Sequence, residues 1–137
     1  MLRAIVLNML GMNEDKEIGQ EALRKFNSLE SIDPDLRTSV YKTVMHNFPT
    51  RENFGKLVEL YKETEFNEEK VRVLESLPFV SDESLLEEVV AMLVDEKQIK
   101  TQDVYIALNS LALNPKGKEK ALSFLKQKLT PLHLFHF

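Results

Sequence analysis

Three histidines carry the most versatile chemistry in this chain of 137 residues, because imidazole can bind a metal or move a proton near neutral pH. His133 and His136 lie three residues apart, a spacing that would place both on one face of a helix. Pro131 and the aromatic residues around them favour irregular chain, and no third ligand is evident. His46 lies near the end of a predicted helix, where an imidazolium can bind the last carbonyl groups. We therefore predict no metal ligands and a structural role for His46.

The other reactive side chains do not converge on a catalytic site. Carboxylates come as adjacent pairs, which point in different directions on a helix and are interpreted as solvated faces: Glu68/Glu69, Glu87/Glu88 and Asp95/Glu96. Tyr41, Tyr61 and Tyr105 have apolar neighbours at helical spacing, which favours packing in a core or along a groove. Cys is absent, and so are the H-E-x-x-H, G-x-S-x-G, calcium-loop and Gly-rich phosphate-loop patterns. The sequence predicts no catalytic and no cofactor-binding residue.

Apolar residues recur with a period close to 3.6 residues, and no run alternates as a strand would. Asp33 followed by Pro34 is typical of a helix N-cap with proline at the first helical position. Further candidate caps are Thr50, Asn67, Ser81 and Thr101. The pattern predicts an all-α fold of about eight helices, at residues 2–10, 15–29, 34–47, 51–65, 68–77, 82–95, 101–113 and 116–129.

The predicted helices also recur in pairs. Leu57 and Val58 return about 32 residues later as Val89 and Val90, which indicates helix–turn–helix units of that length. Such a period is typical of a HEAT or armadillo-like α-solenoid of antiparallel helix pairs, which we favour over a closed bundle. Side chains predicted to be buried between the helices are Phe26, Leu57, Leu74, Val90 and Leu108.

The chain ends suggest a piece of a larger domain. A helix from residue 2 leaves no polar terminal repeat, which a solenoid needs. We assign residues 1–129 to a helical-repeat domain that is a fragment of a larger C-terminal domain. Residues 130–137 are assigned to a tail of uncertain structure.

Composition and charge restrict the partners. The formal net charge is −4 and the sequence pI is about 5.4, which argues against binding to nucleic acid. No apolar run approaches the roughly 20 residues of a membrane span, and residues 1–11 lack the pattern of a signal peptide. Residues 67–100 hold 9 acids and 4 bases, whereas residues 101–137 hold 2 acids and 5 bases. For the basic last helix we favour a solvated face over a specific anion site. We expect a cytoplasmic protein with no membrane and no nucleic acid among its partners.

An ordered set of motifs extends over about residues 2–129. Its members are Leu2-Arg3 followed by an apolar predicted helix, Ala22-x-x-x-Phe26, Ile32-Asp33-Pro34-Asp35-Leu36-Arg37-x-x-Val40-Tyr41, Phe54-x-x-Leu57 with Tyr61-Lys62, Glu68-Glu69-Lys70-x-Arg72, Ile99-Lys100-Thr101-Gln102-Asp103, Asn114-Pro115-Lys116-Gly117 and Ala121-x-x-Phe124-Leu125. In order and spacing, the set resembles the C-terminal helical domain of the gluzincin zinc aminopeptidases, the group of puromycin-sensitive, endoplasmic-reticulum and tricorn-interacting aminopeptidases. The family often has Trp beside Ala121, and this chain has no Trp.

The resemblance implies a function without catalytic residues. In the family, the zinc motif H-E-x-x-H and the substrate-amine motif G-x-M-E-N belong to a preceding domain, and both are missing here. The implied function is a C-terminal fragment of a zinc-dependent aminopeptidase, which covers the active-site cavity and contacts peptide substrate. Its implied partners are the preceding catalytic domain of the same chain and the peptide, and zinc would belong to the full-length enzyme only. The alternative is a free-standing helical-repeat scaffold for protein interaction.

Arg37 and Tyr41 are the candidate site residues within the family-like helix. Arg37 lies in the first helical turn, where the helix dipole disfavours a cation, so we expect it to have an acidic partner. Asp33, Asp35 or an acid on a neighbouring helix could be that partner. We favour an ion pair that fixes helix packing over a cation that meets the peptide carboxylate in the intact enzyme.

Overall fold

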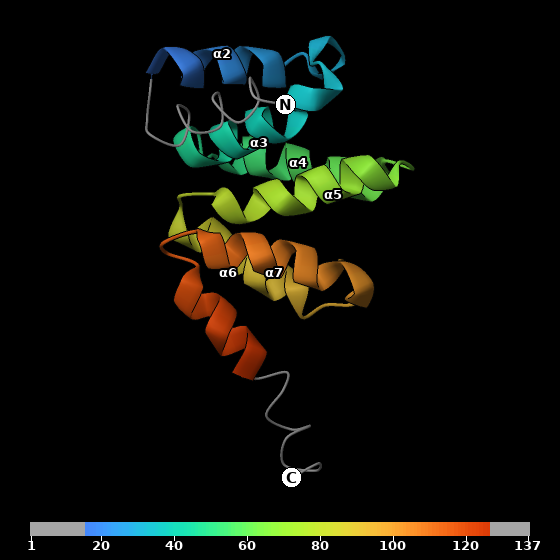
Figure 1. Cartoon of the computed structure of the whole chain (residues 1–137), viewed down its shortest axis with the longest axis vertical. Coiled ribbons are helices and arrows are strands. Elements are labelled where there is room, and N and C mark those ends of the chain that lie inside the picture. Colours follow the sequence, from blue (N-terminus) through green and yellow to red (C-terminus); the bar gives the residue numbers. More distant parts are fainter. Residues whose placement is uncertain (1–15, 127–137) are drawn as a thin grey trace.

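The computed structural model describes residues 16–126, and all the regular elements in that range are helices (Figure 1). These elements are α2 (Lys16–Phe26), η1 (Leu29–Ser31), α3 (Pro34–Asn47), α4 (Arg51–Glu63), α5 (Asn67–Ser76), η2 (Leu77–Phe79), α6 (Glu83–Leu93), η3 (Thr101–Asp103), α7 (Val104–Leu113) and a further helix that begins at residue 118 and is described to residue 126. The predicted all-α fold is confirmed for the described residues. The predicted helix 2–10 and the tail 130–137 lie outside them.

Helix boundaries follow the local signals with a few exceptions. Asp33 caps α3 by accepting a hydrogen bond from the Asp35 amide at 3.2 Å, and Thr50 caps α4 by accepting one from Asn53 at 3.1 Å. The predicted cap Ser81 is wrong, because its neighbour Asp82 accepts from the Leu85 amide at 3.1 Å. The other two predicted caps are also wrong: Asn67 is already the first residue of α5, and Thr101 opens the 3-10 turn η3.

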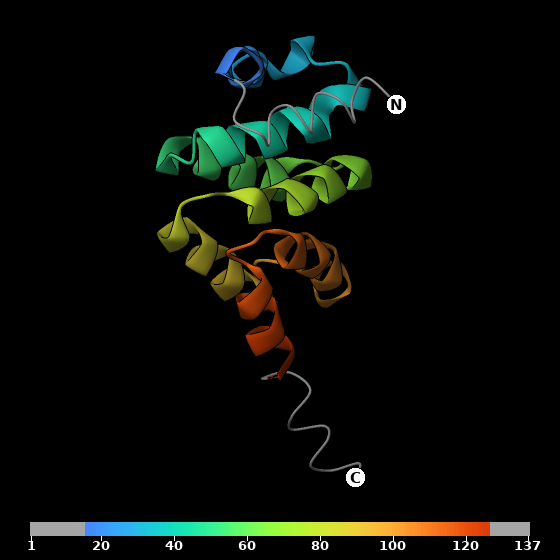
Figure 2. The ribbon, with the colours of Figure 1, turned by 60° about the vertical axis from the view of Figure 1, so that its left-hand side comes forward.

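The helices form a solenoid-like stack of two rows. One row consists of α3, α5 and α7, in which α3 packs on α5 and α5 packs on α7. Helices of the other row pack against it, α2 on α3 and α4 on α5. Successive helices reverse direction, so that the connections alternate between two opposite edges of the stack (Figures 1 and 2). The α2–α3, α4–α5 and α6–α7 connections share one of these edges.

A continuous apolar core runs between the two rows. Phe26, Leu57 and Leu74 are buried, as predicted. Val90 and Leu108 are only partly buried, because their neighbours Val89 and Ala107 face the core instead. Both side chains still pack against the core, so they lie at the border of the buried faces of α6 and α7.

The end of the stack is held by a close approach of two helices. Asn114 ends α7 and donates a hydrogen bond through Nδ2 to the Pro78 carbonyl at 2.7 Å, while its side-chain oxygen accepts from the Lys116 amide at 2.9 Å. A Cβ at Gly117 would overlap the carbonyl oxygen of Leu111, so this turn requires glycine. The Asn114–Gly117 motif thus ties the last described helix to α7 and η2.

Candidate functional site: an ion-pair cluster between α3 and α5

Arg37 pairs with a carboxylate from a different helix. Its Nη1 donates to Oε2 of Glu69 in the first turn of α5, and its Nη2 donates to the Leu29 carbonyl oxygen at 3.1 Å. The Arg37 side chain is 22% exposed and that of Glu69 only 6%. Among the described residues, neither Asp33 nor Asp35 pairs with Arg37. An acid 32 positions away in the sequence therefore offsets the unfavourable position of this cation in the first turn of α3.

Tyr41 completes the cluster from the next turn of α3. Its hydroxyl donates to Oε1 of Glu69 at 3.0 Å, and its ring meets that of Phe26 edge-on, with centroids 6.0 Å apart. Tyr41 is buried, and burial, reinforced by the charge of Glu69, raises the pKa of its hydroxyl well above the ordinary value for tyrosine. The hydroxyl therefore stays protonated and acts as a donor.

Glu69 is the centre of the cluster, which we call the Glu69 cluster: Glu69, Arg37, Tyr41 and Arg72. Arg72 Nη1 lies 3.7 Å from Oε2 of Glu69, so that two guanidinium groups and a hydroxyl surround one buried carboxylate. Buried charges are tolerated when they are paired and hydrogen-bonded. Arg37 Nε is buried and has no hydrogen-bond partner among the described residues. The geometry suits packing of α3 on α5.

The interpretation of Glu69 as a solvated residue is wrong. Glu69 is buried, whereas its neighbour Glu68 is 88% exposed in its side chain. A signal in the sequence could have separated them, because Glu69 lies four residues before the buried Val73 and hence on the same helix face. The other paired acids do lie at the surface, where Glu88 pairs with Arg51 at 2.5 Å and Glu87 pairs with Lys120.

The remaining candidate side chains are dispersed. His46 lies in the last turn of α3, and its carbonyl oxygen accepts a hydrogen bond from Ser81 Oγ at 2.7 Å. Tyr61 is buried and donates to Oδ2 of Asp103 at 3.3 Å; burial and this carboxylate raise its pKa. Tyr105 is 63% exposed and does not lie in the core. His133 and His136 lie outside the described residues, and residues 16–126 contain no group of three potential metal ligands.

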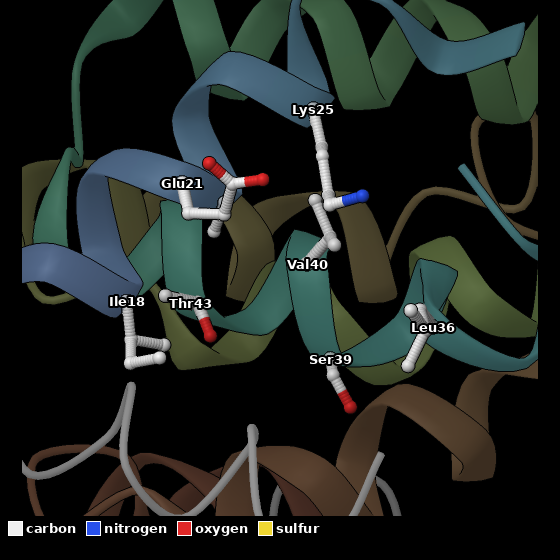
Figure 3. A pocket seen from close by; sticks show the side chains of 8 residues that line it. Ile18, Glu21, Lys25, Leu36, Ser39, Val40 and Thr43 are labelled. Atoms are coloured by element: carbon white, nitrogen blue, oxygen red, sulfur yellow. The ribbon is translucent and has the colours of Figure 1, made fainter. Parts of the chain in front are cut away.

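A small cavity between α2 and α3 is shown in Figure 3. It holds about 150 Å³ and is lined by Ile18, Glu21, Ala22, Lys25, Leu36, Ser39, Val40 and Thr43. Glu21 already pairs with Arg24, at 2.6 Å between Oε1 and Nη2. A wider groove of about 410 Å³ lies between α4 and α6, with the Arg51–Glu88 pair among its lining residues. The cavity lining thus includes an acid, an amine and two hydroxyl groups (Glu21, Lys25, Ser39 and Thr43), whereas the groove is lined by charged and apolar side chains, Gln98 and Gly55, with no hydroxyl or thiol.

Fold and site together define a solenoid-like helical domain with a buried ion-pair cluster between α3 and α5. The chain belongs to the family described as the ERAP1-like C-terminal domain, which it matches over residues 1–134.

Curated relatives from distant organisms are aminopeptidases. The chain is 32% identical to mouse glutamyl aminopeptidase over 130 residues, which cover 92% of this chain and 14% of that protein. It is 28% identical to aminopeptidase M1 of Arabidopsis thaliana over 136 residues, with 93% and 15% covered, and 28% identical to probable aminopeptidase 1 of Saccharolobus solfataricus over 131 residues, with 96% and 16% covered. The chain therefore spans about 15% of the length of the relatives it matches.

Proposed function

We propose that the chain is the noncatalytic helical part of a zinc-dependent aminopeptidase. The match of residues 1–134 to a C-terminal domain family carries this proposal, together with relatives of which the chain spans only 14–16%. Zinc and the water it activates would be held by a catalytic domain that precedes this segment in the same protein.

The proposed role of the segment is to cover the active-site cavity and to contact the peptide substrate. A stack of HEAT-like helix pairs suits this role, because such stacks present long continuous surfaces. The proposed location is the cytoplasm, and the proposed partners include no nucleic acid and no membrane. No helix among residues 16–126 combines the length and the apolar character that crossing a membrane requires.

Within this role, Arg37 and Tyr41 are proposed to position α3 on α5 and not to contact the peptide. The Arg37 guanidinium already binds Glu69 and the Leu29 carbonyl, and the Tyr41 hydroxyl already donates to Glu69. A peptide carboxylate would have to displace Glu69 from both groups. Because the fold already holds Glu69 in position, in the first turn of α5, the internal carboxylate has the advantage over a carboxylate that must bind from solution.

Activity assays on three proteins test the proposal. A longer reading frame with H-E-x-x-H upstream of this segment is expected, and its product should hydrolyse aminoacyl fluorogenic substrates in a zinc-dependent way. The 137-residue chain with added zinc should show no hydrolysis. The full-length protein lacking this segment should lose activity on longer peptides. Zinc-dependent hydrolysis by the chain alone would contradict the proposal, and a gene without an upstream zinc motif would favour the free-standing scaffold.

A further inference from the structure

Phe66 is the most exposed large apolar side chain of the described residues, at 76%. It forms the tip of the α4–α5 connection, with extended backbone at φ −88° and ψ 118°. Its amide donates to Thr64 Oγ1 at 3.2 Å, and its carbonyl oxygen accepts from the amides of Glu69 and Lys70 at 3.1 and 3.2 Å. The backbone is therefore well held although the ring packs on little.

The position of Phe66 makes its residue type unusual. Phe66 is the N-cap of α5, where Ser, Thr, Asp or Asn would accept a hydrogen bond from the first turn. Side chains of this kind cap three other helices of the described stack, namely Asp33, Thr50 and Asp82. At α5 no side-chain cap exists, and an aromatic ring is exposed in its place. Local rules broken without a gain in packing are characteristic of functional positions.

The surroundings of Phe66 are acidic. Residues 63–68 contain Glu63, Glu65 and Glu68 and no base. Among residues 16–126, no ion pair involves Glu63 or Glu65, and Glu68 lies 3.9 Å from Arg72 with its side chain 88% exposed. The tip therefore presents an exposed aromatic ring with three glutamates within three positions of it in the sequence, and with Lys62 and Lys70 four positions away on either side.

Two more exposed apolar side chains lie along the same edge of the stack. Val94, the C-cap of α6, is 47% exposed, and Tyr105, in the first turn of α7, is 63% exposed. Figures 1 and 2 both place the α4–α5 and α6–α7 connections on this edge. The remaining exposed large apolar residues of the described part, Leu113, Leu122 and Leu125, belong to the C-terminal end of α7 and the last described helix.

We propose that this edge, with Phe66 as its anchor, docks into an apolar pocket rimmed by Lys or Arg elsewhere in the same full-length protein. The inference rests on the proposed function, in which this segment is part of a longer polypeptide. An aromatic side chain that fills a pocket is the usual anchor of an interface, and the surrounding acids select a basic rim. About 85% of each relative's length lies outside the region that the chain matches. A surface on the same polypeptide would meet Phe66 at a high effective concentration, which favours it over a surface on a separate protein.

Photo-cross-linking in the full-length protein tests the docking directly. Position 66 is replaced by p-benzoylphenylalanine, which keeps an aromatic ring there, and the cross-linked peptides are identified by mass spectrometry. We expect cross-links to a Lys- or Arg-rich segment outside residues 1–137 of the same polypeptide. The same replacement at Leu113, which is 72% exposed at the other end of α7, is the matched control and should not reach that segment. Cross-links confined to residues 1–137, to a separate protein, or equal to the control would overturn the proposal.

A pair of substitutions provides a second readout in the same protein. Phe66→Asn removes the anchor and supplies a cap, so that amide hydrogen exchange should rise in the basic segment while α5 itself becomes no less protected. Leu113→Asn should leave exchange in the basic segment unchanged. Unchanged exchange in both variants would overturn the docking. Aminopeptidase activity of the unsubstituted protein reports on the proposed function separately, because an active enzyme without the cross-link refutes only the docking surface.

Discussion

At the start of α5, an apolar side chain lies in solvent and a charged one is buried, the reverse of the usual distribution in a folded protein. Phe66 is 76% exposed, whereas Glu69 is 5% exposed. The carboxylate is stable inside because Arg37, Arg72 and Tyr41 surround it. The Phe66 ring, by contrast, is not covered by any side chains among residues 16–126 that would explain why an aromatic residue stands there. The partners within the fold explain why the charge of Glu69 is buried. The exposed ring of Phe66 has no such partners, and its explanation lies in a surface outside the described residues.

The largest expected effect is at the buried end of this comparison. Glu69→Ala leaves two guanidinium groups without their carboxylate and should lower the free energy of unfolding by about 3–5 kcal/mol. Glu68→Ala, one residue earlier and exposed, should leave stability nearly unchanged. Chemical denaturation of the two variants checks this, and equal midpoints would show that the Glu69 cluster does not hold α3 on α5.

Truncation should distinguish a fully buried core side chain from one at the border of the core. Leu74 is 1% exposed and Leu108 is only partly buried. Leu74→Ala should cost about 2–5 kcal/mol, and Leu108→Ala clearly less, because fewer neighbours surround the lost methyl groups. Thermal denaturation measures both. If neither variant changes the melting temperature, the assignment of the core is wrong.

Arg37→Ala should lower the stability of the chain by about 1–3 kcal/mol, because it removes one partner of a buried carboxylate while Arg72 and Tyr41 remain. Arg37→Lys should recover only part of the loss, since an ammonium cannot reproduce the two-sided contact with Glu69 and Leu29. Unchanged stability, together with a loss of affinity for longer peptides in the full-length enzyme, would assign Arg37 to the peptide instead.

Tyr41→Phe removes one donor to Glu69 and should cost about 1 kcal/mol at neutral pH. The pKa of Tyr41 is raised in the folded chain, so the unfolded chain releases this proton first as the pH rises above about 10. Wild-type stability should therefore fall more steeply above that pH than the stability of Tyr41→Phe. Denaturation at a series of alkaline pH values tests this, with the exposed Tyr105→Phe as the control. Parallel curves for wild type and Tyr41→Phe would argue against the buried donor.

The smallest effect is expected at the exposed end and has the opposite sign. Phe66→Asn supplies the missing cap of α5 and should raise the free energy of unfolding of the chain by about 0.5–1 kcal/mol. Gly55→Ala in α4, where the added Cβ would have no atom within 4 Å apart from adjacent residues and the backbone of its own helix, should give a similar gain through helix propensity alone. Differential scanning calorimetry compares them. A loss of stability in Phe66→Asn would mean that the ring contributes to the fold.

Local patterns predicted much of the fold. The predicted helix 34–47 is confirmed, because Asp33 and Pro34 mark its start and the apolar period continues along it. The predicted helix 15–29 was too long, since a turn at Asn27 and the 3-10 segment η1 follow α2 at Phe26. The helix predicted at 101–113 begins as η3 and becomes α-helical only at Val104. Such ends depend on single hydrogen bonds that the apolar period does not record.

The helical class, the order of the helices and the caps at Asp33 and Thr50 follow from local sequence, because they depend on groups within a few residues of one another. Tertiary structure alone decided which acid meets Arg37 and Tyr41, since Glu69 lies 32 and 28 positions away from them. Stacking of α3 on α5 likewise decided that Glu69 would be buried, and the edge of that stack left Phe66 in solvent. The physical reason is that a desolvated charge needs partners in space, and only the packed helices bring those partners together.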